Sequence, residues 1–286
     1  MIAGMSINYE KQHALGLAGL ALLRNWLVGD KQTIRSILDE IKKISISGEK
    51  LLRTKKLKAV KYDVLGGYQI WAETYDTIPN LLVKVEEPVV KSILKKLPPG
   101  KAFDAACGTG RYSAFLHSLG HEGTGVDLSS AMLQQAKIRE PSASFIQGNL
   151  DKLPLKNSSV DLVICALAFA HINDIDETLS EFTRVVRLGG KIVISDINPW
   201  VVALGAHAEF KYRVGEWSYV ANHIYWHSAY IQAFRKAGLN IVRCEEPLMK
   251  LKHVKLAQEG FKLSKRTVAE ALCGLPIALI WVLERS

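Results

Sequence analysis

The chain has few cysteines, and no two of them have the sequence spacing of zinc ligands. Its four cysteines lie far apart among 286 residues and include no CxxC pair: Cys107, Cys165, Cys244 and Cys273. This spacing argues against a zinc cluster and a disulfide framework, and it is typical of a protein in a reducing cytosol. With 9 prolines and 21 glycines, the composition also excludes fibrous and low-complexity architectures.

Long apolar runs are also lacking. The most apolar stretch, residues 14–28, is interrupted by Arg24 and Asn25, whereas a membrane-spanning helix needs about 20 apolar residues. The first residues show neither the basic start nor the small-residue cleavage site of a signal peptide. We therefore expect a cytoplasmic protein with no membrane partner.

Acidic residues are too few to balance the basic ones, and the surplus lies at both ends of the chain. The formal net charge is +9, from 37 Lys and Arg against 28 Asp and Glu. Residues 1–61 carry +7, residues 62–246 carry −2 and residues 247–286 carry +4. A nucleic-acid enzyme more often spreads a basic groove over its catalytic body. We interpret the basic ends as solvated helices and expect no nucleic-acid partner.

Two patterns divide the chain into two predicted domains. Within residues 10–61, apolar side chains recur at helical spacing. One predicted helix face carries four of them: Leu15, Ala18, Leu22 and Trp26. Because two amphipathic helices cannot form a core alone, we predict that residues 1–61 form a helical extension. It would cap the substrate side or form the subunit interface of a homo-oligomer, beside a main domain of residues 62–286.

From about residue 88, short apolar strands alternate with helices. The predicted strands of this part are 101–106, 123–127, 143–147, 160–166 and 191–196. Nearly unbroken apolar strands separated by helices form parallel sheets that are covered on both faces. The pattern therefore predicts a doubly wound α/β domain, and two further strands are predicted at 239–245 and 276–284.

A glycine-rich segment lies where the first predicted strand turns into a helix. Its residues 104–111 read Asp-Ala-Ala-Cys-Gly-Thr-Gly-Arg. Gly108 and Gly110 let the backbone approach a ligand, and the helix N-terminus offers free N–H groups. Asp127 ends the next predicted strand, where a carboxylate can accept hydrogen bonds from ribose hydroxyls. Together these residues predict a nucleoside site.

Two residues help to distinguish between nucleosides. A dinucleotide fingerprint requires G-x-G-x-x-G or A, but Ser113 stands at its last position. Asp104 also ends a strand, where it could contact a cationic amino-acid group and would repel a pyrophosphate. A nicotinamide-dependent oxidoreductase is therefore the disfavoured alternative. A second alternative is an RNA methyltransferase or RNA-binding protein that uses the basic ends.

The motifs resemble those of the class I S-adenosylmethionine-dependent methyltransferases, above all the small-molecule branch with the ubiquinone- and menaquinone-biosynthesis enzymes. The segments that carry the resemblance are residues 102–111, 125–132, 148–155, 159–165 and 187–195. The resemblance implies a Rossmann-like seven-stranded sheet with an antiparallel last strand. It also implies S-adenosylmethionine as the cofactor and methyl transfer to a small apolar or aromatic metabolite.

The resemblance further implies the residues of the methyl-donor site. These are Tyr75, Asp104, Ala106, Cys107, Gly108, Gly110, Asp127, Leu128, Met132, Asn149, Leu150 and Ala166. Asp104 and the glycines would line the methionine part, Asp127 would hold the ribose, and the later residues would surround the adenine and the sulfonium. Two positions depart from the family, which usually has Gly where Ala106 stands and often has Asp where Asn149 stands.

Methyl transfer from a sulfonium needs little chemical help from the protein. The donor is already activated, so positioning and the exclusion of water do most of the work. A general base is needed only for a protonated acceptor, and the candidates are, in order, His171, Tyr75 and His223. His223 and His227 are four residues apart, but no third ligand is spaced with them, so we expect no metal.

The segment 199–227 interrupts the alternation of strands and helices. It leaves the sheet at the carboxyl end of the fifth predicted strand, which is the edge where open α/β folds bind ligands. Aromatic residues crowd this segment: Trp200, Phe210, Tyr212, Trp217, Tyr219, Tyr225 and Trp226. Flat side chains suit the wall of a site for a small apolar or aromatic acceptor, so we predict a substrate-side insertion here.

Overall fold

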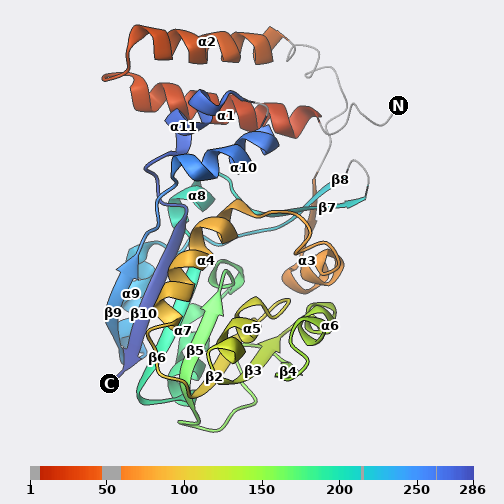
Figure 1. The fold of residues 1–286 in the computed structure, drawn as a ribbon, viewed down its shortest axis with the longest axis vertical. Coiled ribbons are helices and arrows are strands. Elements are labelled where there is room, and N and C mark those ends of the chain that lie inside the picture. Colours follow the sequence, from red (N-terminus) through yellow and green to blue (C-terminus); the bar gives the residue numbers. More distant parts are fainter. Residues whose placement is uncertain (1–6, 47–58, 214–215, 262) are drawn as a thin grey trace. The chain divides into compact units, whose positions relative to one another are not determined.

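The computed structural model describes residues 7–46, 59–213, 216–261 and 263–286 (Figure 1). These residues form two compact units. The helical unit comprises the described residues of Met1–Val60, Phe210–Ser218 and Leu248–Pro276, and the sheet unit comprises the rest. The helical unit thus includes two segments of the predicted main domain. No helix among the described residues is long and apolar enough to cross a membrane.

A seven-stranded sheet is the frame of the sheet unit, in the order β4-β3-β2-β5-β6-β10-β9. Its strands are β2 (Lys101–Ala105), β3 (Glu122–Asp127), β4 (Ser144–Gln147), β5 (Val160–Ala166), β6 (Val186–Ile197), β9 (Leu239–Glu245) and β10 (Ala278–Arg285). Strands β4, β3, β2, β5 and β6 pair in parallel, and β10 runs antiparallel to β6 and to β9. The predicted doubly wound sheet and its antiparallel last strand are confirmed.

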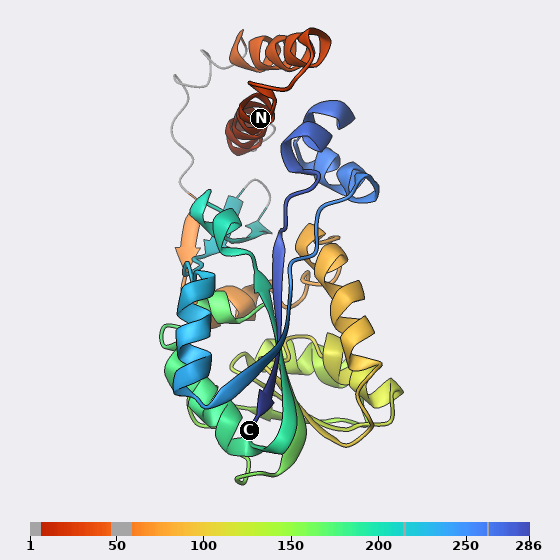
Figure 2. The ribbon, with the colours of Figure 1, turned by 90° about the vertical axis from the view of Figure 1, so that its left-hand side faces the viewer.

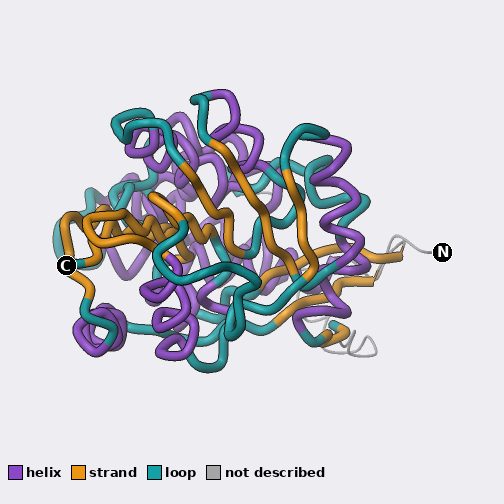
Figure 3. The backbone as a smooth tube through the Cα atoms, turned by 90° about the horizontal axis from the view of Figure 1, so that it is seen from below, coloured by secondary structure: helices purple, strands orange, loops and turns teal. Residues whose placement is uncertain are grey.

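Helices cover both faces of this sheet (Figures 2 and 3). They are α4 (Leu81–Leu94), α5 (Arg111–Ser118), α6 (Ser130–Arg139), α7 (Ile175–Val185) and α9 (His227–Lys236). Side chains of a strand alternate between the two faces, so that Ile192 and Ile194 of β6 belong to one buried cluster and Val193 to the other. The first cluster includes residues of α7 and α9, and the second includes residues of α4 and α5.

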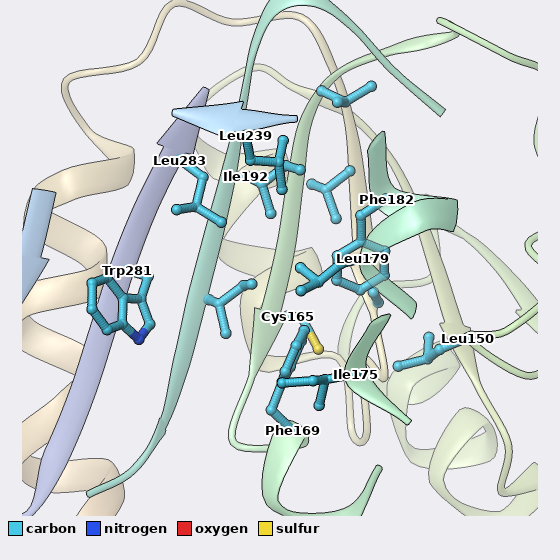
Figure 4. Packing of buried hydrophobic residues seen from close by; sticks show 14 of the residues in the cluster. Leu150, Cys165, Phe169, Ile175, Leu179, Phe182, Ile192, Leu239, Trp281 and Leu283 are labelled. Atoms are coloured by element: carbon cyan, nitrogen blue, oxygen red, sulfur yellow. The ribbon is translucent and has the colours of Figure 1, made fainter. Parts of the chain in front are cut away.

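The larger cluster shows why the strands are so apolar. Leu179 and Phe182 of α7 lie against the strands that carry Cys165 and Ile192 (Figure 4). All four side chains are fully buried, and the ring of Phe182 meets that of Phe169 at 6.0 Å. A strand with helices on both faces has no polar side, which explains its unbroken apolar sequence.

The helical unit contains α1 (Ile7–Asn25), α2 (Lys31–Ile46), α10 (Leu251–Phe261) and α11 (Lys265–Leu272). The buried apolar side chains of α1 are mostly small, namely Ala14, Ala18 and Ala21, with Leu17 as the one larger residue described as buried. At the end of α1, the Arg24 guanidinium donates to the carbonyls of Glu270, Ala271 and Cys273. The predicted apolar face is therefore right at Ala18 but wrong at Trp26, which lies beyond the helix and is 72% exposed.

The predicted insertion is built from one short helix and two strands. They are α8 (Pro199–Ala203), β7 (Ala208–Arg213) and β8 (Glu216–Val220), and β8 also pairs with β1 (Val60–Tyr62). Asn198 caps α8 by accepting from the N–H of Trp200, and Pro199 occupies the first helical position, where its missing N–H costs nothing. The side chain of Tyr212 lies outside the described residues.

One buried carboxylate ties α4, α5 and β6 together. Glu86 of α4 is fully buried. Its Oε1 accepts from the Tyr112 hydroxyl at 2.7 Å and from the Ser195 hydroxyl at 2.5 Å, and its Oε2 lies 3.1 Å from Nη1 of Arg111. Every partner of this charge donates to it, as a buried carboxylate requires.

Replacing Glu86 by alanine should strongly destabilise the sheet unit. Removing the carboxylate leaves the Arg111 charge and two buried hydroxyls without their acceptor, and breaking a buried pair in this way costs about 3–5 kcal/mol. Urea denaturation of Glu86→Ala measures the loss. Glu87→Ala is the matched control in the same helix, since Glu87 is partly exposed and lies 3.7 Å from Arg111. Equal losses in both variants would contradict this role of Glu86.

Candidate active site

The carboxyl ends of β2 and β3 bring the predicted nucleoside residues together. The two strands are parallel and in register, with Ala105 beside Val126, so the segments that follow them emerge at the same edge. Asp104 and Asp127 are therefore neighbours in space although 22 residues of chain separate them. This edge carries the site.

The glycine-rich loop after β2 has a left-handed backbone at three positions. The φ angles of Ala106, Gly108 and Gly110 are +54°, +53° and +77°. A side chain in this region costs about 1–2 kcal/mol, so the Gly that the family usually has at 106 would be less strained than Ala106. A Cβ at Gly110 would lie 3.0 Å from Cβ of Ala136, whereas one at Gly108 would meet no atom within 4 Å. Gly110 thus lets α5 approach α6, and Gly108 borders open space.

Asp127 holds this loop in place. Its Oδ2 accepts from the N–H of Gly108 at 2.8 Å, and its Oδ1 accepts from the N–H of Ser129 at 2.8 Å. Burial raises the pKa of the Asp127 carboxyl, although the hydrogen bonds from Ser129 and Gly108 oppose the shift. A carboxylate has about four acceptor positions, so two bonds to the backbone leave capacity for ribose hydroxyls.

Asp104 explains the serine that departs from the dinucleotide fingerprint. The Ser113 hydroxyl donates to Oδ2 of Asp104 at 2.6 Å, and both side chains are buried. Burial raises the pKa of Asp104 to about 7, and the Ser113 hydrogen bond and the Arg111 charge oppose the shift. A glycine or alanine at 113 would leave this carboxyl without that donor.

An aromatic group from α3 (Val64–Trp71) and the residues after it lies near this edge. The ring of Tyr68 is 5.7 Å from Trp71 and 6.2 Å from Tyr75. Burial raises the pKa of Tyr75, and the charge of Asp127 adds to the shift. Burial also raises the pKa of Tyr68, and the charges of Asp127 and Asp196 add to the shift. The Tyr68 hydroxyl lies 2.8 Å from Nε2 of His171, so α3 faces the carboxyl ends of the strands.

His171 is held at both ring nitrogens. Its Nδ1 lies 3.2 Å from the carbonyl oxygen of Ala221 and its Nε2 lies 2.8 Å from the Tyr68 hydroxyl. A carbonyl can only accept, so Nδ1 carries the proton and the neutral ring accepts from Tyr68 at Nε2. Burial lowers the pKa of His171, and the neighbouring His223 lowers it further. The lone pair at Nε2 of His171, the leading candidate base, therefore accepts the hydrogen bond from the Tyr68 hydroxyl.

Asp196 at the end of β6 fixes the turn that carries His171. Its Oδ2 accepts from the N–H of Ala170 at 2.6 Å and from the Tyr230 hydroxyl at 3.1 Å. Burial raises the pKa of Asp196 to about 7 despite these hydrogen bonds. The short helix η1 (Phe169–His171) is therefore anchored to the sheet through a buried acid.

The residues predicted around the adenine lie after β3 and β4, and Ala166, predicted beside the sulfonium, is the last residue of β5. Leu128 is 38% exposed, Met132 and Leu150 are buried, and Asn149 is exposed. Asn149 bonds within its own turn, since its Oδ1 accepts from the N–H of Leu150 at 2.8 Å. Ala166 is half-buried. All five remain predictions as ligand contacts.

The sequence predicts His223 as a candidate base and Cys107 as a residue of the methyl-donor site. His223 is exposed, and its backbone N–H donates to the carbonyl of Ala170 at 2.7 Å. Cys107 donates its N–H to the Val126 carbonyl at 2.9 Å, and burial raises the pKa of its thiol, which keeps the thiol neutral. Within the described ranges, no three His, Cys, Asp or Glu side chains gather as metal ligands would.

Sequence reasoning missed three residues of this region, and two of them had a signal. Asp196 lies one residue before the end of its strand, as Asp104 does in β2. Glu86 is an acid on the apolar face of a helix, four residues before Val90. Tyr68 shows helical spacing with Trp71, but its partner His171 is 103 residues away, and nothing in the sequence pairs the two.

Known proteins with similar sequences include methyltransferases, as the glycine loop and the acids at the strand ends led us to expect. Residues 103–194 match the model of a methyltransferase domain. These residues therefore resemble a methyltransferase domain in sequence. Demethylmenaquinone methyltransferase of Thermotoga maritima is 28% identical, over 73% of this chain and 93% of its own length. Malonyl-[acyl-carrier protein] O-methyltransferase of Yersinia pestis is 32% identical, over 49% of this chain and 52% of its own. The chain spans about half the length of the malonyl-[acyl-carrier protein] O-methyltransferases that it matches.

Solved structures share the fold of this chain. An S-adenosylmethionine-dependent methyltransferase from Mesorhizobium loti has a TM-score of 0.56 at 21% identity, covering 72% of this chain and all of its own, 100%. Geranyl diphosphate C-methyltransferase from Streptomyces coelicolor has a TM-score of 0.55 at 18% identity, covering 70% of this chain and 79% of its own. That second structure was solved with geranyl diphosphate and S-adenosyl-L-homocysteine.

The tautomer of His171 can be measured directly. We expect nitrogen NMR to show a proton on Nδ1 and none on Nε2 at pH 7, because burial lowers the pKa of this ring. Tyr68→Phe removes the donor to Nε2 and should shift the resonance of that nitrogen while leaving the Nδ1 proton in place. A proton on Nε2 in the unaltered protein would contradict the assignment.

Proposed function

We propose that the chain transfers the methyl group of S-adenosylmethionine to a small apolar or aromatic metabolite. The observation that carries the proposal is the arrangement of Asp127, which holds the glycine loop through the N–H of Gly108 and keeps acceptor capacity for a ribose. The methyltransferase domain at residues 103–194 supports the same reaction.

The residues at the strand ends fit the donor. Gly108 borders open space where a ligand can approach the backbone, and Asp127 would hold the ribose. Asp104 is a buried acid suited to the cationic amino group of the methionine part. When bound, the donor supplies an electrophilic methyl group on a sulfonium, so the chain has to orient the two partners and exclude water.

The acceptor class is inferred from the aromatic group and from similar proteins. Tyr68, Trp71 and Tyr75 offer flat side chains beside His171, and such surfaces suit apolar or aromatic ligands. Two proteins similar to this chain are named for small organic acceptors, demethylmenaquinone and geranyl diphosphate.

An acceptor that arrives protonated would need a base, and Tyr68 and His171 can act together. The Tyr68 hydroxyl already donates to Nε2 of His171 at 2.8 Å. Its oxygen would take the acceptor's proton as its own proton passes to Nε2. Tyr75 and His223 are the other candidates, and neither has a hydrogen bond to a basic side chain among those of the described residues.

A labelled donor tests the proposed activity. The full chain is incubated with S-adenosylmethionine that carries an isotopic methyl label, and with metabolite extract, total RNA or total protein in parallel. We expect label in the metabolite fraction, and much less of it with Asp127→Ala at a donor concentration below saturation. Label only in RNA or protein would contradict the proposed acceptor class, and no transfer to any fraction would oppose the activity itself.

Donor binding should depend on pH through Asp104. Its pKa is raised to about 7 in the free protein, and a cationic amino group binds only the ionised carboxylate. The affinity for S-adenosylhomocysteine should therefore rise with pH and fall by up to about tenfold for each unit below 7. Isothermal calorimetry at several pH values measures this, and in buffers of different ionisation enthalpy it also counts the released proton.

The variant Asp104→Asn should bind S-adenosylhomocysteine more weakly at pH 8, and its affinity should lose most of the dependence on pH. Asp196→Asn is the matched control, because the pKa of Asp196 is also raised to about 7 but its partners are Ala170 and Tyr230. Asp196→Asn should keep the pH dependence of S-adenosylhomocysteine binding. A profile that Asp104→Asn leaves unchanged would remove Asp104 from the donor site.

Two glycine substitutions separate backbone strain from ligand contact. Gly108 and Gly189 have similar φ angles, +53° and +72°, and a Cβ at either would meet no atom within 4 Å. Alanine at each should cost about 1–2 kcal/mol of stability from the left-handed backbone. Only Gly108→Ala should also weaken S-adenosylhomocysteine binding, by tenfold or more, since its methyl group enters the open space. Equal affinities in the two variants would contradict a ligand at Gly108.

A further inference from the structure

The turn between α1 and α2 exposes apolar side chains to solvent. Trp26, Leu27 and Val28 follow one another in the sequence and are 72%, 76% and 86% exposed. Leu23, in the last turn of α1, is 66% exposed. Scattered apolar residues are normal on a surface, but adjoining ones mark an interaction site. We call these four residues the apolar turn.

The apolar turn is presented by a fixed framework. The N–H of Gly29 donates to the Asn25 carbonyl at 2.8 Å, and the Asn25 amide donates to Oε2 of Glu270 at 3.0 Å. Asp30 then caps α2 by accepting from the N–H of Thr33 at 2.9 Å. Both ends of the turn are therefore held by hydrogen bonds, while its apolar side chains are exposed.

The surroundings of the turn are basic. The segments of the helical unit contain 19 Lys and Arg against 8 Asp and Glu, a net charge of +11, whereas the sheet unit carries −2. Lys31 follows the turn directly, and Arg266 lies beside it, with Nη2 3.6 Å from Oδ2 of Asp30. In Figure 1 the turn joins α1 to α2 at one end of this helix pair.

We propose that the helical unit docks on the surface of an anionic lipid bilayer through the apolar turn. Tryptophan and leucine beside lysine and arginine are the composition of segments that lie at a membrane interface, and basic side chains are attracted to anionic headgroups. A second copy of the chain would bring +11 against +11, and RNA would leave the apolar side chains uncovered. The sequence predicts no membrane partner because it lacks a spanning segment, and the proposal departs from that prediction because docking at the surface needs no such segment.

Vesicle sedimentation of the full chain tests this surface. The vesicles are of phosphatidylcholine alone or of equal parts phosphatidylglycerol and phosphatidylcholine. We expect binding to the anionic vesicles only, weakened by added salt because screening reduces the attraction. The double variant Trp26→Ser, Leu27→Ser should bind about tenfold or more weakly. Leu188→Ser is the matched control, since Leu188 is 68% exposed in the sheet unit, and it should bind like the unaltered chain.

Three results would overturn the proposal. The first is equal sedimentation with both kinds of vesicle, and the second is an equal loss of binding in Leu188→Ser. The third is that the unaltered chain does not bind vesicles but binds another partner instead. That partner would be a second copy of the chain, detected by sedimentation velocity, or RNA. Donor binding by the double variant is measured alongside. Because no residue of the donor site is changed, intact donor affinity separates a failure of docking from a failure of the proposed function.

Discussion

The carboxylate of Asp127 is the interaction on which the candidate site depends. Its two oxygens accept from the N–H groups of Gly108 and Ser129, which joins the loop after β2 to the start of α6. The Ser129 hydroxyl in turn donates to Oε1 of Gln69 at 3.0 Å, so α3 is held by the same connection. A single acid at a strand end thus positions the glycine loop, one helix N-terminus and the helix that carries Tyr68.

Buried acids recur along this edge of the sheet. Asp127 is the last residue of β3, and Asp104 and Asp196 are each one residue before the end of β2 and β6. Burial raises the pKa of each of them. Each carboxyl accepts hydrogen bonds from the backbone or from a hydroxyl, which limits the cost of burial. Asp104 and Asp127 adjoin the glycine loop, where a ligand that brings positive charge would stabilise their ionised forms, and the amino group of a methyl donor is such a charge. Asp196 is hydrogen-bonded to Ala170 and Tyr230 instead.

The sequence predicted the sheet well because its signals are local. Apolar strands between helices, and an acid after a strand, can be read from neighbouring residues, and this is how Asp127 was found. The antiparallel direction of β10 was implied by the resemblance to a known family. The pairing of Tyr68 with His171 could not be predicted, since it depends on where α3 lies across the sheet edge. The exposure of Trp26 was missed for a related reason. Periodicity gave α1 more than one apolar stripe, and packing in the helical unit selected the small residues Ala14, Ala18 and Ala21.

Calorimetric titration of the full chain with S-adenosylhomocysteine and with NAD tests most directly whether the strand ends hold a methyl donor. A donor site at Gly108 and Asp127 predicts saturable binding of S-adenosylhomocysteine at one site per chain, weakened by about 1–3 kcal/mol in Asp127→Ala because hydrogen bonds to a charged group are lost. It predicts no binding of NAD, which Asp104 would repel. Binding of NAD without binding of S-adenosylhomocysteine would contradict it.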